Sequence, residues 1–188
     1  KQSGHITTVG FQMYCDLLSI EIQKTRSEGG AVQKTPQVTT SFQPDISSDY
    51  IENMSLRIDY YYRVGSATSV EQLNKIEKEL VDVFGPIPDK TKKLLLVASL
   101  KNRYKSTAVS QIDIQDSVLK IIIQPLEEEE QLVFLSRVGM YKHKTLENIR
   151  FKEVSGGLLG IFLNVFDPGN VFDLLFDFVH LFDPIDTA

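Results

Sequence analysis

The chain has 188 residues, which at about 150 residues per domain corresponds to one domain with an additional segment. Its formal net charge of −5 argues against a protein whose whole surface binds a polyanion, and its one cysteine, Cys15, excludes an internal disulfide. No apolar stretch approaches the ~20 residues that span a bilayer. Because the sequence begins without an initiator Met or a signal peptide, we interpret it as a piece of a larger protein.

The N-terminal fifth of the chain is predicted to be a helix followed by a linker. The helix runs from about Thr8 to Lys24, where apolar residues recur at spacings of three and four. Thr25–Gln37 contains a Gly-Gly pair and few apolar residues, which is typical of a linker. A β-branched run, Val38–Phe42, then predicts a strand. We therefore divide the chain into an N-terminal piece over 1–37 and a domain over 38–188.

The next part of the sequence has helical periodicity throughout. Three helices are predicted, at about 50–62, 69–84 and 89–104. The second has the clearest limits, because Thr68 or Ser69 can cap its start and Gly85 occupies the position that ends a helix. Asp89 is expected to cap the third helix.

The second half of the domain changes to the two-residue period of strands. We predict a hairpin from 110–115 and 118–124, a helix from Glu127 to about Met140, strands near 148–154 and 158–165, and a last helix over about 170–182. Helices grouped first and antiparallel hairpins later indicate an α+β fold: an N-terminal helix and linker, a helical cluster packed with hairpins, and a C-terminal helix.

No catalytic chemistry is predicted from the residues. The Gly156-Gly157 and Gly160 cluster leads into a strand and has no Lys after it, so it fits a hairpin turn and not a phosphate loop. Cys15 has no His within helical reach and fits a structural thiol. No catalytic residue or resident cofactor is therefore expected.

Two further patterns admit a functional and a structural interpretation. On the last helix Asp173, Asp177 and His180 share a face that could ligate a metal, although they also form the one polar stripe of an apolar helix. We favour the solvated stripe and expect no metal site. The helices on either side of Gly85 resemble a helix-turn-helix, in which Lys92 and Arg103 could contact DNA. Since the basic residues spread around the third helix, we favour a buried helix with lysines at its ends.

The second helix carries an acidic face. Glu79 and Asp82 are predicted to project away from the apolar stripe, with Lys75 and Lys78 four residues before them as ion-pair partners. Composition alone describes an ordinary solvated face.

Spaced matches along the first 105 residues resemble the C-terminal domain of bacterial transcription-repair-coupling factors. The matching segments are Gln2-Ser3-Gly4, Val9-Gly10-Phe11, Tyr50-Ile51, Arg57-Ile58, Tyr60-Tyr61, Arg63-Val64, Glu79-Leu80-x-Asp82-x-Phe84-Gly85, Pro88 and Leu94-Leu95. The chain departs from the family at Ser47, Glu52, Asn53 and Val83, where members commonly have Pro, Pro, Asp and Arg.

This resemblance implies a role in a larger machine. The parent would be a cytoplasmic, ATP- and Mg-dependent translocase on double-stranded DNA that displaces stalled RNA polymerase and recruits the excision-repair A protein. Gln2, Ser3 and Gly4 would close a translocation motif of the motor, whose ATP site lies upstream. The C-terminal domain would be an autoinhibitory clamp that docks through Glu79 and Asp82 on an N-terminal module resembling the excision-repair B protein. The alternative function is a DNA-binding module of the helix-turn-helix type.

Overall fold

The structure is a computed structural model that describes residues 35–116, 118–140, 149–154, 156, 158–164 and 171–182. The predicted helix at 8–24, Cys15 and the Gln2-Ser3-Gly4 motif lie outside these residues. The described chain divides into two compact units. We call residues 43–102 the helical unit, and residues 35–42 together with 103–182 the sheet unit.

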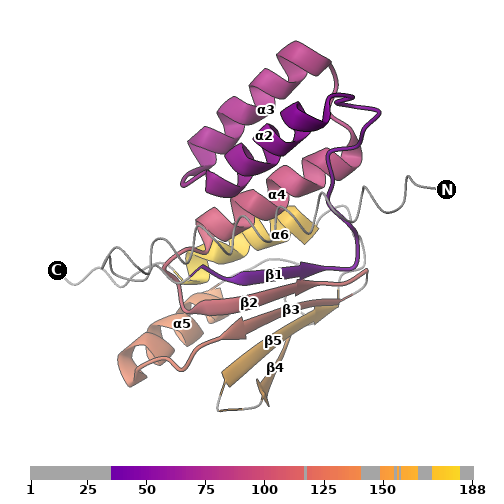
Figure 1. The fold of residues 1–188 in the computed structure, drawn as a ribbon. Helices are drawn as coiled ribbons and strands as arrows, with labels where there is room; N and C mark the ends of the chain where they lie inside the picture. The colour runs from indigo at the N-terminus through magenta and orange to yellow at the C-terminus, as the bar shows by residue number, and fades with distance from the viewer. Residues whose placement is uncertain are drawn as a thin grey trace. The chain divides into compact units, whose positions relative to one another are not determined.

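The helical unit contains α2 (Met54–Ser66), α3 (Val70–Phe84) and all but the last residue of α4 (Asp89–Arg103). α2 and α3 lie side by side, joined by a short connection (Figure 1). Each of these two helices begins at a polar cap: Asn53 accepts a hydrogen bond from the N–H of Leu56, and Ser69 accepts one from the N–H of Gln72. Gly85 ends α3 with a positive φ of 83°, a conformation that a residue with a Cβ rarely adopts.

Apolar side chains from all three helices form the core of the helical unit. This core includes Ile46, Ile51, Tyr60, Tyr61, Val64, Leu73, Ile76, Leu80, Ile87, Leu94, Leu95 and Ala98. Along the apolar stripe of α3, Leu73, Ile76 and Leu80 are buried, and burial of these residues orients the opposite side of α3 towards solvent.

The start of α2 differs from the prediction. The sequence placed Tyr50 and Ile51 inside the helix, whereas the structure begins it at Met54. The N–H groups of Tyr50 and Ile51 instead donate to the carbonyl of Ser47 in a preceding turn. Since Asn53 then supplies the cap, the helix cannot extend backwards without giving up that hydrogen bond.

The sheet unit is built on five strands in the order β1-β2-β3-β5-β4 (Figure 1). They are β1 (Gln37–Thr40), β2 (Val109–Ile114), β3 (Val118–Ile123), β4 (Ile149–Val154) and β5 (Leu158–Asn164). Both predicted hairpins, β2–β3 and β4–β5, are confirmed as antiparallel pairs. The sequence did not indicate that β3 pairs with β5, nor that β1 adds to β2 in parallel, and these pairings join both hairpins into one sheet.

The two faces of the sheet differ in polarity, as alternation along the strands requires. Ile112, Ile121 and Ile161 occupy neighbouring positions in register on one face and are fully buried. One residue along each strand, Asp113 and Lys120 form an ion pair on the other face. Together with the helices of the helical unit, this five-stranded sheet confirms the expected α+β class.

Three helical segments complete the sheet unit: α5 (Glu128–Met140), α6 (Val171–Phe178) and the 3-10 segment η3 (Val179–Phe182). The buried Tyr104 hydroxyl donates to the carbonyl of Leu175, and the rings of Phe134 and Phe182 stack with centroids 5.4 Å apart. The last helix was predicted as one helix to Phe182, but its α-helical part ends at Phe178. Within the described residues, no helix combines the length and the apolar character that crossing a membrane would demand.

Candidate functional site

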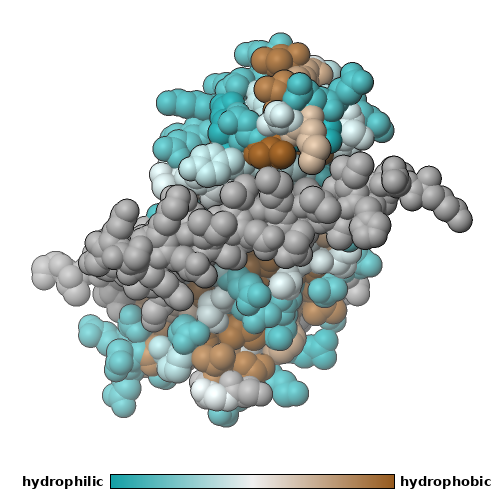
Figure 2. Space-filling view, in the orientation of Figure 1, coloured by the Kyte–Doolittle hydropathy of each residue, from teal (hydrophilic) through white to brown (hydrophobic). Residues whose placement is uncertain are grey.

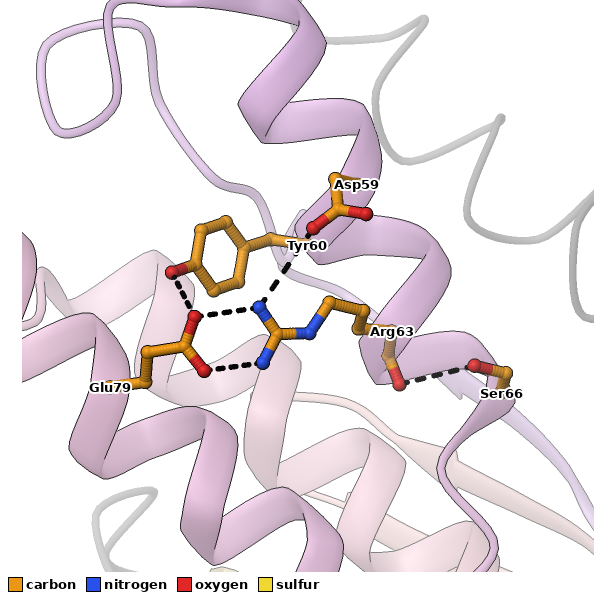
Figure 3. Close-up of polar contacts among 5 residues, drawn as sticks. All are labelled: Asp59, Tyr60, Arg63, Ser66 and Glu79. Atoms are coloured by element: carbon orange, nitrogen blue, oxygen red, sulfur yellow. Dashed lines mark hydrogen bonds and ion pairs between the residues drawn. The ribbon is translucent and has the colours of Figure 1, made fainter.

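The carboxylate of Glu79 is bound by two side chains of the neighbouring helix (Figure 3). The two terminal nitrogens of Arg63 donate to its two oxygens, Nη1 to Oε1 at 2.7 Å and Nη2 to Oε2 at 2.5 Å. The hydroxyl of Tyr60 donates to Oε1 at 2.9 Å. A bidentate guanidinium and a phenol together set the orientation of this carboxylate and tie α2 to α3.

Asp59 brings a second carboxylate to Arg63. Its Oδ2 lies 3.8 Å from Nη1 of Arg63, one helical turn earlier on α2. The Arg63 guanidinium also lies over the Tyr60 ring, 4.9 Å from the centroid. We call Asp59, Tyr60, Arg63 and Glu79 the α2–α3 charged cluster. The three charged side chains of this cluster are accessible, with exposed fractions of 57% for Asp59, 34% for Arg63 and 43% for Glu79.

The electrostatics of the cluster follow from these contacts. The hydrogen bonds from Arg63 and then from Tyr60 lower the pKa of Glu79 to about 2, so its carboxylate is charged at any physiological pH. The same carboxylate raises the pKa of Arg63 above its already high range. Burial, and next the hydrogen bond to Glu79, raise the pKa of the Tyr60 hydroxyl, which therefore remains a donor.

Asp82 differs from Glu79 in having no such partner. It is exposed on α3, and its side chain makes no ion pair or hydrogen bond with any residue that the structure describes. Within those residues Lys75 and Lys78 also make no ion pair, so the predicted pairing with Glu79 and Asp82 is absent. Glu79 pairs with Arg63 instead, whose planar guanidinium makes two parallel hydrogen bonds to the carboxylate, a geometry that a lysine ammonium does not match.

The expected outward position of the two acids is thus found for Asp82 and only in part for Glu79. Glu79 lies on the flank of α3 that faces α2, half-exposed and already bound. The residues around them are mixed in character, since Val81 and Val83 on α3 are also exposed. The visible surface of the helical unit in Figure 2 is mainly hydrophilic, with separate hydrophobic side chains between the polar ones.

The structure gives less support to the other two candidate sites, the basic pair on α4 and the possible metal site on the last helix. Lys92 is exposed on α4, whereas the guanidinium of Arg103 lies over the ring of Phe176, 4.7 Å from its centroid, and is engaged within the sheet unit. Among the described residues no group of three or more His, Cys, Asp or Glu side chains could hold a metal ion. Asp173, Asp177 and His180 therefore do not converge as a metal site. Gly156 lies in the β4–β5 turn with a φ of 80° and Gly160 lies within β5, so these two described glycines belong to a hairpin, as predicted.

Sequence reasoning missed the role of Arg63 and a buried acid, Asp45. Asp45 is 3% exposed and accepts a hydrogen bond from the hydroxyl of Tyr61, which also accepts one from the N–H of Ile46. The carbonyl of Asp45 accepts from the hydroxyl of Thr91, and its Oδ2 has no hydrogen-bond partner among the described residues. The proximity of Arg63 to Glu79 could have been inferred from two antiparallel helices and a short connection, but no local signal marks Asp45.

Comparison with known proteins connects this arrangement to a family. The family model described as TRCF domain matches residues 40–132, which include the whole charged cluster and Asp82. The chain is 32% identical over 121 residues to a transcription-repair-coupling factor of Haemophilus influenzae and 31% identical over 121 residues to that of Escherichia coli. Each alignment covers 60% of this chain but 10% of the relative, so the chain spans about a tenth of the length of these relatives.

A solved structure shows the same fold. It is the crystal structure of the C-terminal domain of a transcription-repair coupling factor, matched with a TM-score of 0.60 and 20% identity. The match covers 81% of this chain and 95% of the solved one. At this identity the likeness establishes the architecture, and it leaves the roles of individual side chains to be argued from their geometry.

Proposed function

Because this chain belongs to the transcription-repair-coupling-factor family and corresponds to its C-terminal domain, we propose that it is a non-catalytic, autoinhibitory domain. In this proposal the domain docks on an N-terminal module of the same protein that resembles the excision-repair B protein. Docking covers the surface at which the excision-repair A protein binds, and release of the domain exposes that surface. The chain thus regulates the parent translocase and performs no reaction of its own.

The main support for this proposal is the exposure and the pairing of the two carboxylates on α3. Asp82 is exposed with no ion-pair partner among the described residues, and the neighbouring Glu79 is held in a defined orientation with 43% of its side chain accessible. One oriented acid beside one unpaired acid suits recognition of basic side chains, because electrostatic complementarity sets orientation and specificity. Exposed ion pairs contribute only about 0–1 kcal/mol each, and weak contacts suit a domain that must be released.

The remaining activities belong to the parent in this proposal. ATP, Mg and double-stranded DNA would be bound by motor modules upstream, with Gln2, Ser3 and Gly4 as the end of a translocation motif. RNA polymerase and the excision-repair A protein would be partners of the whole protein, which would act in the cytoplasm. This division agrees with the places of Gly156 and Gly160, which belong to the β4–β5 hairpin and not to a loop that precedes a helix.

The test is to remove both acids in the full-length protein. We expect Glu79→Gln combined with Asp82→Asn to raise the affinity for the excision-repair A protein and the ATPase rate, by about two- to fivefold for each carboxylate if each ion pair contributes up to ~1 kcal/mol. Binding of the excision-repair A protein is measured by fluorescence anisotropy and ATP turnover by phosphate release.

A matched control is Glu128→Gln, which removes an exposed carboxylate from α5. If the double variant behaves like the Glu128 variant in both assays, Glu79 and Asp82 do not hold an autoinhibited state and the proposal is wrong.

A further inference from the structure

Arg63 lies between two carboxylates on different helices. It is bound to Glu79 of α3 through two hydrogen bonds, while Asp59 on its own helix lies 3.8 Å from Nη1 (Figure 3). A guanidinium has five N–H donors, so it can shift between these acids without losing all of its hydrogen bonds. The two carboxylates therefore offer Arg63 alternative positions at the surface of the helical unit.

We propose that Arg63 forms its ion pair with Glu79 only in the undocked domain. When a guanidinium of the docking partner binds Glu79, Arg63 transfers to Asp59. This inference rests on the proposed function, since it requires that the α2–α3 surface docks on a partner. It adds a regulatory residue, Arg63, to that surface.

The position and exposure of the Glu79 carboxylate allow it to bind a second guanidinium in place of Arg63. Tyr60, itself a buried residue, holds Oε1 through its hydroxyl whether or not Arg63 is bound, so the carboxylate keeps its orientation during the exchange. Oε2 has a single described partner, Arg63, and the side chain is 43% exposed. An incoming guanidinium can therefore reach the oxygen that Arg63 vacates and reproduce its bidentate geometry.

Asp59 is suited to receive Arg63. An acid four residues before a base on a helix is the favourable order for an ion pair, and Asp59 is 57% exposed, so a closer contact needs no burial of charge. The Arg63 side chain also remains over the Tyr60 ring on its own helix. Because an exposed ion pair is lost and another is gained, the exchange changes the docking equilibrium little and keeps it reversible.

The experiment measures docking directly in the full-length protein. A pair of fluorophores, one on the C-terminal domain and one on the N-terminal module, reports the docked fraction by energy transfer, and affinity for the excision-repair A protein provides a second measure. Arg63→Lys preserves the charge but cannot bind both oxygens, so Glu79 is released more easily. We expect this variant to increase the docking constant by about two- to fivefold, the range set by one exposed pair.

Asp59→Asn removes the acid that would receive Arg63, and we expect it to lower the docking constant by a similar factor. In an Arg63→Met background the same Asp59→Asn change should have no effect, because no guanidinium remains to be transferred. Asp49→Asn is the matched control, since Asp49 is an exposed acid of the same unit with no described contact to Arg63. If Asp49→Asn reduces docking as much as Asp59→Asn does, general charge attraction explains the loss, and the proposed transfer of Arg63 is wrong.

The two proposals can fail separately. If Glu79→Gln and Asp82→Asn leave energy transfer unchanged, the docking surface is wrong and the proposed function fails with it. If those variants lower docking but Arg63→Lys does not raise it, the docking surface is correctly assigned and the proposed transfer of Arg63 is wrong. Thermal unfolding of each variant confirms that the domain is folded, and Arg63→Gln replaces Arg63→Lys if the latter is not.

Discussion

At the scale of single residues, the contact between Tyr61 and Asp45 connects the segment before α2 to the core of the helical unit. Tyr61 donates to Oδ1 of Asp45, a residue that is 3% exposed and whose Oδ2 has no hydrogen-bond partner among the described residues. Burial, and next the hydrogen bond to Asp45, raise the pKa of the Tyr61 hydroxyl far above its usual value, so it stays protonated and continues to donate. This donor is therefore essential to the burial of Asp45.

We expect Tyr61→Phe to lower the free energy of unfolding by about 2–3 kcal/mol, because it leaves a buried carboxylate without its donor. Urea unfolding of the chain, followed by circular dichroism, measures the change. Tyr62→Phe is the matched control, since Tyr62 is 47% exposed and should change stability by less than about 0.5 kcal/mol. Equal effects of the two substitutions would show that the Asp45 contact does not stabilise the fold.

The Glu79–Arg63 pair predicts a pH dependence of stability. The pKa of Glu79 falls from an ordinary 4.5 to about 2 on folding, so the pair stabilises the native state fully above pH 4.5 and loses its contribution as the pH falls towards 2. We expect the difference in unfolding free energy between the native sequence and Glu79→Gln to be no more than about 1 kcal/mol at pH 7, because both side chains are partly exposed.

Urea unfolding at about pH 7, 4 and 3 tests this expectation, and the difference should shrink as the pH is lowered. A difference that stays constant over this range would mean that Glu79 is not held by a pH-dependent ion pair.

At the scale of elements, α3 ends where a glycine allows it. Gly85 has a φ of 83° and a ψ of −159°, and its N–H donates to the carbonyl of Val81 at 2.9 Å. We expect Gly85→Ala to destabilise the chain by about 1–3 kcal/mol, since a Cβ is strained in this conformation although no neighbouring atom obstructs it. Thermal unfolding measures the loss.

The matched glycine for this experiment is Gly139, which lies inside α5 with an ordinary φ and with open space where a Cβ would be. Gly139→Ala should raise stability by up to about 1 kcal/mol, because alanine has the higher helix propensity. Opposite signs for the two substitutions support the conformational explanation. A loss at both positions would instead indicate that the chain does not tolerate any added methyl group.

Element boundaries were predictable where a local signal determines them. The limits of α3 follow from Ser69 and Gly85, and those of the hairpins from alternating residues around turns. The start of α2 was misplaced because Tyr50 and Ile51 continue the apolar pattern of the helix, although Asn53 provides its cap. Periodicity alone does not distinguish a residue inside a helix from an apolar residue that packs beside its end.

At the scale of the whole molecule, the alternative of a DNA-binding module can be tested on the chain itself. The net charge is −5, and although Lys92 and Arg103 are both exposed, the guanidinium of Arg103 already lies over the ring of Phe176. We expect no change in the fluorescence anisotropy of a labelled DNA duplex when the chain is added at low salt. Binding that weakens steeply with salt and is lost in Lys92→Ala would favour the DNA-binding alternative.

The sequence by itself determined the α+β class, the type and order of the described helices and strands, and the presence of Glu79 and Asp82 on α3. Each of these depends on caps, turns and periodicity, which are set by residues close together in the chain. The tertiary structure alone decided the sheet order, the burial of Asp45 and the ion pair between Glu79 and Arg63. Those features join residues 16 or more positions apart, and their partners depend on which elements pack together, which no local pattern encodes.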